Sequence, residues 1–174
     1  MTSHKMPVSI VVMGPSGVGK TTTAELLAKT FGWRFAEADE FHPPENIEKM
    51  SKGVPLDDED RAPWLEKIRD WISAEAEAGR DTVLTCSALK RRYRDVLRTA
   101  KAEVKFLALV ADEGLVASRL EKRTGHYMPS SLLASQFAAL EVLSPDEPGV
   151  KVTVDVAPEA VVDRAISGLK LKRP

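Results

Sequence analysis

The sequence predicts an α/β fold built around a parallel sheet of five strands. Two observations lead to this fold class. Short apolar runs alternate with segments of helical periodicity to the end of the chain, as they do when a helix crosses over the sheet between successive strands. A glycine-rich segment follows the first apolar run, where such folds join a strand to a helix. The predicted strands are 8–13, 34–38, 82–87, 104–110 and 150–156.

The segments between these strands place apolar residues at the spacing of amphipathic helices. The first of them ends at Gly32, a residue type that commonly terminates helices. Pro63 is expected to begin the helix that buries Trp64 and Trp71, so that the acidic residues 54–62 form a connecting loop. The predicted helices are 21–31, 42–53, 63–79, 89–100, 113–123, one capped by Ser130 or Ser131, and one that starts at Pro158.

Length and composition favour one globular domain over residues 1–174. Lys and Arg total 25 against 26 for Asp and Glu, so the charge balance gives no reason to expect nucleic acid or an anionic membrane as a partner. Cys86 is the single cysteine, which fits a reducing compartment, and we interpret it as a small buried residue. No apolar run is long enough for a secretion signal or a bilayer span, so we expect a cytoplasmic protein.

The segment GPSGVGKTT at residues 14–22 matches the phosphate-binding P-loop pattern G-x-x-x-x-G-K-[ST]. Glycines let backbone N–H groups turn toward phosphate oxygens, and the N-terminus of the following helix adds its dipole. The pattern predicts that Lys20 reaches the β- and γ-phosphates of ATP and that Thr21 binds Mg²⁺. The residues predicted to bind the nucleotide here are Gly14, Ser16, Gly17, Val18, Gly19, Lys20, Thr21 and Thr22.

Three classes of P-loop protein are compatible with this motif. A GTPase would need an Asn-Lys-x-Asp reader, but the only asparagine, Asn46, is followed by Ile. A motor or transporter ATPase would need an apolar strand that ends in Asp. Asp112 could play that part, although its position favours an N-cap for the next helix. The length, the five predicted strands and the basic segment late in the chain favour the third class, a small-molecule kinase.

Three further segments resemble the gluconokinase family. They are ADEFHPPENIEKMSKGVPLDDEDRAPWL (38–65), CSALKRRYRDVLR (86–98) and RLEKRTGHYMPSSLLASQFAALE (119–141), and with the P-loop they cover roughly residues 8–156 in the family's order. The resemblance implies a three-layer P-loop fold like that of nucleoside monophosphate kinases, with a helical lid near 119–143. It also implies transfer of the γ-phosphate of ATP to the 6-hydroxyl of D-gluconate by a homodimer.

One departure from the family pattern bears on a predicted site residue. The family reads Asp-Gly-Asp before the histidine block, whereas this chain has Glu37-Ala38-Asp39. The second acidic position is kept, so the resemblance implies that Asp39 joins Thr21 in holding Mg²⁺. It leaves open whether Glu37 takes part.

Several acceptor-site residues are implied by the same blocks. Asp39 follows a predicted strand, where the carboxyl ends of α/β strands form active sites, and is expected to orient or deprotonate the acceptor hydroxyl. His42 is implied to bind gluconate hydroxyls, and Arg61 to bind its carboxylate. Lys90 stands at a helix start, where the positive end of the helix dipole disfavours a cation. Binding of an anionic ligand would explain why a lysine occupies this position. The substrate residues implied in the same basic segment are Lys90, Tyr93 and Arg94.

The predicted lid supplies the remaining site residues. Arg119 and Arg123 lie one helical turn apart, and the resemblance places the first against adenine and the second over the phosphates. His126 and Gln136 are implied to contact substrate when the lid closes. The predicted catalytic residues are Lys20, Asp39, Lys90 and Arg123.

Two other functions remain open at this point. One is phosphorylation of another polyhydroxy acid or of a nucleoside monophosphate. The other is a non-catalytic ATP sensor, which would bind nucleotide without needing Asp39.

Overall fold

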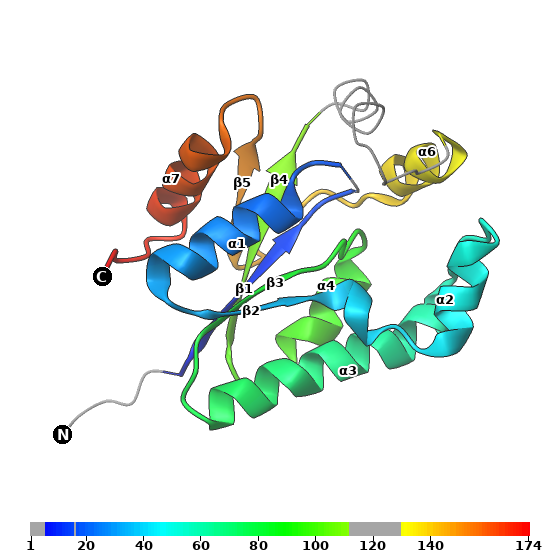
Figure 1. Cartoon of the computed structure of the whole chain (residues 1–174), viewed down its shortest axis with the longest axis horizontal. Coiled ribbons are helices and arrows are strands. Elements are labelled where there is room, and N and C mark those ends of the chain that lie inside the picture. Colours follow the sequence, from blue (N-terminus) through cyan, green and yellow to red (C-terminus); the bar gives the residue numbers. More distant parts are fainter. Residues whose placement is uncertain (1–5, 16, 112–129) are drawn as a thin grey trace.

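The computed structural model describes residues 6–15, 17–111 and 130–174, with the side chains of 130–133 and 135 left out. Its centre is a sheet of five parallel strands in the order β2-β3-β1-β4-β5 (Figure 1), which confirms the predicted α/β class. The strands are β1 (Val8–Met13), β2 (Arg34–Glu37), β3 (Thr82–Thr85), β4 (Glu103–Val110) and β5 (Gly149–Thr153).

Helices cover both faces of the sheet, giving three layers. Helices α3 and α4 pack on one face, and α1 and α7 pack together on the other, as Figure 1 shows. The predicted helix 113–123 lies outside the described residues. The described helices are α1 (Lys20–Phe31), the 3₁₀ helix η1 (Ala38–Phe41), α2 (Pro44–Ser51), α3 (Asp58–Glu77), α4 (Arg91–Arg98), α6 (Ser130–Ala139) and α7 (Pro158–Gly168).

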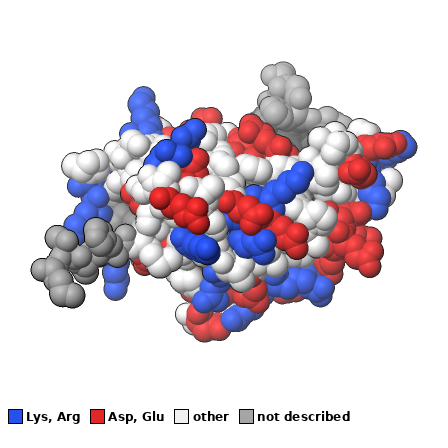
Figure 2. Space-filling view, turned by 90° about the horizontal axis from the view of Figure 1, so that it is seen from below, with Lys and Arg blue, Asp and Glu red and all other residues white. Residues whose placement is uncertain are grey.

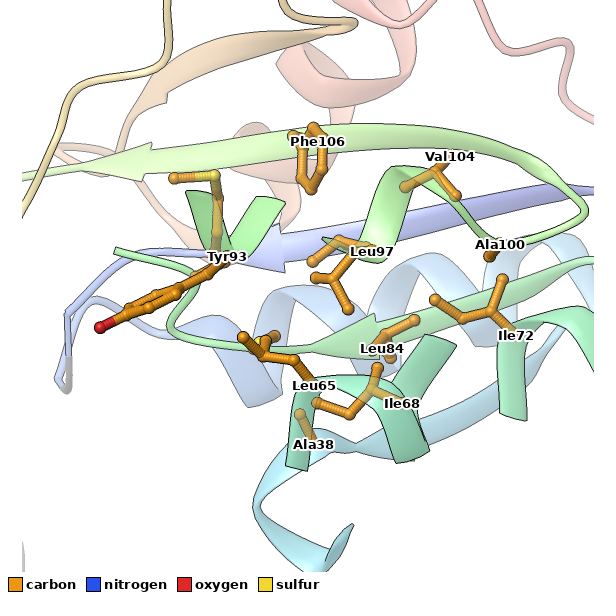
Figure 3. Packing of buried hydrophobic residues seen from close by; sticks show 14 of the residues in the cluster. Ala38, Leu65, Ile68, Ile72, Leu84, Tyr93, Leu97, Ala100, Val104 and Phe106 are labelled. Atoms are coloured by element: carbon orange, nitrogen blue, oxygen red, sulfur yellow. The ribbon is translucent and has the colours of Figure 1, made fainter. Parts of the chain in front are cut away.

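The sheet is buried on both faces, which explains the continuous apolar runs of the sequence. On the α3–α4 side Ile68 and Leu97 pack with Phe106 (Figure 3), and on the other side Leu27 and Ile166 pack with strands β1 and β4. Tyr93 lies at one end of the first cluster, with its hydroxyl directed away from the apolar residues in Figure 3. The apolar cores therefore hold the two helix layers against the sheet, and the Tyr93 hydroxyl lies at the edge of one core.

The strand register brings several loops to one edge of the sheet. Val12 of β1 is level with Thr85 of β3, and Met13 is level with Ala108 of β4. The backbone N–H of Gly14 donates to the carbonyl of Ser87, 3.3 Å away. The glycine-rich loop, η1 and the β3–α4 connection therefore meet at the carboxyl ends of the strands, where open α/β sheets bind ligands.

The molecular surface mixes both signs of charge. On the face shown in Figure 2, Lys and Arg side chains alternate with Asp and Glu. In the parts of the chain that the structure describes, no helix has both the length and the apolar character needed to cross a membrane.

The start of α3 differs from the sequence prediction. The helix begins at Asp58, and Pro63 lies inside it. Asp57 and Asp60 form a capping box, in which each carboxylate accepts a hydrogen bond from the other residue's backbone N–H, at 2.7 and 3.0 Å. Residues 58–62, predicted as loop, are therefore helical, because this cap and the acidic first turn stabilise a start one turn and a half before the proline.

Other boundaries shift by a few residues. Strand β3 ends at Thr85 and β5 at Thr153, earlier than predicted, and α2 starts at Pro44 and ends before Gly53. The predicted core position of Trp64 is confirmed, since its side chain is buried against the α3–α4 face, and Trp71 is partly buried there.

We expect the Asp57→Ala substitution to lower the free energy of unfolding by about 1 kcal/mol, because the N-terminal N–H groups of α3 lose their cap. Urea denaturation followed by circular dichroism would measure the change. Glu59→Ala is the matched control, since this exposed side chain of the first turn has no hydrogen bond to the helix backbone among the described residues. An equal loss in both variants would contradict the importance of the capping box.

Candidate active site

The loop between β1 and α1 has the backbone geometry of a phosphate cradle. Gly14, Gly17 and Gly19 have φ angles of 143°, 86° and 95°, which residues with a Cβ rarely adopt. A Cβ on Gly14 would lie 2.9 Å from Val18 Cγ2 and 3.1 Å from the carbonyl oxygen of Leu109. The predicted glycine pattern is thus required by the loop's conformation. Ser16 lies outside the described residues.

The start of α1 is suited to binding an anion. Its N-cap, Gly19, provides no side-chain cap, and its first turn contains no acidic residue. Lys20 Nζ donates hydrogen bonds to the carbonyls of Gly14 and Pro15, at 2.9 and 3.1 Å, so the ammonium group lies within the loop. Backbone N–H groups, the helix dipole and a lysine therefore converge where phosphates are bound in P-loop proteins.

Oxygen ligands suitable for a hard cation lie beside the loop. The Thr21 hydroxyl donates a 2.7 Å hydrogen bond to Glu37 Oε1 at the end of β2. Asp39 follows two residues later, with 85% of its side chain exposed. The described residues contain no group of three or more His, Cys, Asp or Glu side chains that could hold a metal. Mg²⁺ commonly binds through one or two carboxylates with phosphate and water, so the residues present fit this ion.

His42 is held rigidly next to Asp39. Its ring stacks on Trp64, with centroids 4.3 Å apart and planes 13° apart, and its Nε2 lies 4.0 Å from Asp39 Oδ1. Trp64 Nε1 donates a 2.6 Å hydrogen bond to the carbonyl of Ala38, which fixes η1 against α3. Burial lowers the pKa of His42; Asp39 opposes this shift, and Arg61 adds to it.

Asn46 is a residue of this site that sequence reasoning missed as a contributor. It is 2% exposed, and its side-chain amide contacts both His42 Nδ1, at 3.1 Å, and the carbonyl of Asp60, at 2.8 Å. The available signal was its position one helical turn after His42.

A second polar group, the Asp58 cluster, joins the starts of α3 and α4. It consists of Asp58, Arg61, Lys90, Arg92 and Tyr93. The Tyr93 hydroxyl donates to Asp58 and accepts a 3.1 Å hydrogen bond from Arg61 Nη1. Lys90 Nζ and Arg92 Nη1 approach the two Asp58 oxygens at 3.4 and 2.5 Å.

The Asp58 cluster gives Lys90 an ion-pair partner and still carries more positive than negative charge. Sequence reasoning had found no local partner for Lys90, and the carboxylate of Asp58, from another helix, supplies one. The hydrogen bond from Tyr93 is the main reason that the pKa of Asp58 lies below its ordinary value. Burial, with the bond to Asp58, raises the pKa of Tyr93, so its hydroxyl remains a donor. Two cations thus bind one carboxylate, and a third, Arg61, binds the tyrosine that donates to it, so the cluster carries excess positive charge that suits it to an additional anion.

Cys86 directly follows β3 at the carboxyl edge of the sheet and is buried. Burial raises the pKa of its thiol to about 12, with Asp39, Lys20 and Arg61 as the charged groups that also act on it. The thiol is 2% exposed, as predicted for a small core residue. The thiol therefore stays protonated at neutral pH, as expected of a packing residue and not of a nucleophile.

A cavity of about 240 Å³ adjoins the glycine-rich loop. One wall belongs to the loop and α1, and the other to the segment that connects β5 to α7, which the sequence analysis does not include among the nucleotide-binding residues. Its signal was that this segment also follows a strand at the carboxyl edge. The lining residues are Gly17, Val18, Gly19, Thr22, Thr23, Val154, Val156, Pro158 and Val161.

Known proteins resemble this chain over nearly its whole length. A gluconokinase from Gluconobacter oxydans is 48% identical over 171 residues, covering 95% of this chain and 96% of that protein. The chain belongs to the gluconokinase family. Residues 10–143 also match a family model described as an AAA domain. The nucleotide-binding P-loop kinase fold expected from the sequence is thereby confirmed.

Solved structures agree with this family. A sugar kinase from Janibacter is 50% identical, covers 95% of both chains and superposes with a TM-score of 0.90. A gluconokinase from Sinorhizobium meliloti is 43% identical, covers 96% of this chain and 94% of its own, and has a TM-score of 0.85. Gluconokinases are phosphotransferases, so the chain is a member of an enzyme family that uses ATP.

The structure corrects the expectation that Arg94 binds substrate. Its side chain has no exposed surface. Nε and Nη2 donate to the two oxygens of Glu147, at 2.6 and 2.9 Å, and Nη1 donates to the carbonyl of Ala88 at 2.9 Å. Adjacent helical residues point in different directions, so Arg94 faces the segment after α6 while Tyr93 faces α3. Arg94 anchors that segment, and burial of Glu147 is outweighed by these bonds, which hold its pKa below the ordinary value.

The gluconokinase lid predicted at 119–143 is described only in part. Arg119, Arg123 and His126 lie outside the described residues, as does Asp112. Gln136 lies in α6 and is half-buried. The roles of these residues stay predictions.

We expect Arg94→Met to lower the free energy of unfolding by about 3–5 kcal/mol, because Glu147 would be left as an uncompensated buried charge. Urea denaturation would measure the loss, and the double variant Arg94→Met with Glu147→Leu should recover much of it. Arg98→Met is the matched control. Its guanidinium lies 3.9 Å from Asp95 on the exposed face of the same helix, so its loss should stay below about 1 kcal/mol. Similar losses for Arg94 and Arg98 would contradict the anchoring role.

Proposed function

We propose that the protein catalyses ATP-dependent phosphorylation of D-gluconate at its 6-hydroxyl, giving 6-phospho-D-gluconate and ADP. The observation that carries the reaction class is the P-loop with Lys20 bonded inside it, joined through Thr21 and Glu37 to the end of β2, two residues before the exposed Asp39. The acceptor is taken from the gluconokinase relatives, which match almost the full chain.

ATP would be held on the P-loop side of this edge. Backbone N–H groups of the glycine-rich loop and the start of α1 would surround the β- and γ-phosphates, with Lys20 as the cation among them. The cavity between the loop and the β5–α7 segment is apolar on the side of Val154 and Val156 and would receive the nucleoside. Thr22 lines the same cavity, consistent with its predicted nucleotide contact.

The acceptor would lie between Asp39 and the Asp58 cluster. Asp39 is exposed and would accept the proton of the 6-hydroxyl as the oxygen attacks the γ-phosphorus. The new O–P bond forms while the bond to the β–γ bridging oxygen breaks, and that electron pair leaves on ADP. The gluconate carboxylate would bind Arg61 and Lys90, with Tyr93 as a further donor. His42 would hydrogen-bond a substrate hydroxyl.

Thr21, Asp39 and Glu37 are the groups that would hold Mg²⁺. When bound, this ion neutralises charge that develops on the phosphate oxygens. The position of Glu37, with its carboxylate on the Thr21 hydroxyl, leads us to include it in the proposed set beside the two residues that the sequence indicated.

The remaining assignments extend the family resemblance. We propose that Arg119, Arg123, His126 and Gln136 act from a lid that closes over the bound substrates and excludes water. We also propose a cytoplasmic homodimer; a monomeric mass by light scattering would contradict the dimer.

Two other functions are separated by one assay. Phosphorylation of a different polyhydroxy acid or of a nucleoside monophosphate predicts turnover with another acceptor. A non-catalytic ATP sensor predicts nucleotide binding without turnover, and an output that Asp39→Asn leaves unchanged.

We expect ADP release from Mg-ATP in the presence of gluconate and not of shikimate, AMP, glycerate or glucose. A coupled assay would measure it. Lys20→Ala should abolish turnover, and Asp39→Asn should reduce kcat about 10²–10⁴-fold through loss of the proton acceptor. The controls change exposed residues of the same charge: Lys29→Ala in the last turn of α1, and Glu40→Gln next to Asp39. Turnover with another acceptor alone would refute the gluconate assignment.

We expect Glu37→Gln to raise the Mg²⁺ concentration that gives half-maximal rate by about tenfold or more, since a carboxylate near the ion would be lost. Initial rates at saturating ATP and gluconate across a Mg²⁺ titration would measure this. Glu25→Gln, an exposed change on α1, serves as the control. An unaltered Mg²⁺ requirement would contradict a role of Glu37 in binding the ion and leave only its hydrogen bond with the Thr21 hydroxyl.

A further inference from the structure

The side chain of Asn46 determines which nitrogen of His42 carries a proton. Asn46 Nδ2 lies 2.8 Å from the backbone carbonyl of Asp60, a group that only accepts hydrogen bonds. The atom facing this carbonyl is therefore the amide nitrogen and not the amide oxygen. Its other hydrogen is directed at His42 Nδ1, 3.1 Å away.

Nδ1 of His42 must then be an acceptor. A neutral imidazole has one N–H and one unprotonated nitrogen, and the hydrogen bond made by one nitrogen sets the state of the other. With Nδ1 accepting from Asn46, the proton resides on Nε2. An accepting Nδ1 makes the ring neutral, and burial, which lowers its pKa, favours the same form; the charged groups that act on the ring are Asp39 of η1 and Arg61 of α3.

The ring cannot exchange its nitrogens without losing contacts. His42 stacks on Trp64, and Trp64 is tied to η1 through the carbonyl of Ala38. Turning the imidazole over would replace Nδ1 with a carbon and leave the buried amide of Asn46 without this acceptor. The Nε2 edge is therefore held toward Asp39.

This Nε2–H remains available for a ligand. Its separation of 4.0 Å from Asp39 Oδ1 is too long for a hydrogen bond, and no other described residue accepts from it. The His42 side chain is 4% exposed, yet the described residues contain no fully buried side-chain nitrogen or oxygen that lacks a hydrogen bond, so Nε2 is not completely enclosed. An oxygen atom can lie at about 2.8–3.0 Å from both Nε2 and Oδ1 at once, since these atoms are 4.0 Å apart.

We propose that Asn46 is a positioning residue that fixes His42 in the Nε2–H form, so that His42 and Asp39 address the same hydroxyl of the acceptor. His42 donates to one lone pair of the hydroxyl oxygen, and Asp39 accepts the hydroxyl proton. The second lone pair of the oxygen stays free to attack the γ-phosphorus. This inference rests on the proposed function for its ligand. Its statement about the tautomer rests on the protein alone.

The first test is the tautomer of His42 in the unaltered protein. The chain has three histidines, so ¹⁵N-labelled imidazole resonances can be assigned by comparison with His42→Gln. At about pH 8, above the ordinary histidine pKa, we expect the spectrum of an Nε2–H ring with an unprotonated Nδ1. A proton on Nδ1, or an even mixture of the two tautomers, would overturn the proposal.

The second test separates positioning from support of the fold. Asn46→Leu removes the donor and should shift His42 toward a tautomer mixture, with kcat/KM for gluconate reduced about tenfold. Lys49→Met is the matched control on the same helix, because Lys49 also binds Asp60, through the carboxylate at 2.8 Å, without touching His42. It should leave both the tautomer and kcat/KM within about twofold of the unaltered protein.

The outcomes distinguish this inference from the proposed function. An unchanged His42 spectrum in Asn46→Leu, or an equal change in Lys49→Met, would refute the positioning role. The Nε2–H spectrum in a protein that phosphorylates no gluconate would support the tautomer assignment while refuting gluconate as the acceptor.

Discussion

Strand β1 lies at the centre of the parallel sheet, between β3 and β4, and its carboxyl end determines where the rest of the site is built. The chain turns there through three glycines with left-handed backbone angles and enters α1 with an uncapped N-terminus. Because the strands are parallel, the segments after β2 and β3 arrive at the same edge. The glycine-rich loop, the exposed Asp39 and the connection that leads into α4 are thereby placed at one edge of the sheet by the pairing of the strands.

Polar groups at this edge are held in place by specific hydrogen bonds, since each buried polar atom needs a partner. Trp64 illustrates the arrangement: its indole N–H fixes the carbonyl before Asp39, and its ring supports His42. Asn46 then connects His42 to the first turn of α3. Aromatic and amide contacts consequently hold the backbone before Asp39 and the ring beside it, while the carboxylate itself stays exposed.

Charge is distributed differently in the Asp58 cluster and in the buried ion pair of the same helix. In the Asp58 cluster the cations outnumber the carboxylate and remain partly exposed, so an anionic ligand would meet groups that still bear net positive charge. Arg94 follows Tyr93 on α4, and its side chain is completely buried. It is paired through two hydrogen bonds with the equally buried side chain of Glu147. The first arrangement suits reversible binding, and the second fixes the chain segment that follows α6.

The sequence by itself determined the five strands, the P-loop, the order of the kinase blocks and the position of Asp39 after β2. These features depend on local periodicity and on residue spacing, and the backbone angles of the glycine loop follow from them. The start of α3 was missed, although its capping box is also local, because Pro63 was given more weight than Asp57 and Asp60. Only the tertiary structure decided the partners of Lys90, Arg94 and Asn46, which lie 32, 53 and 14 residues away in the chain. Packing of separate helices sets these contacts, and the direction of each side chain on its helix decides whether a cation faces the ligand or the core.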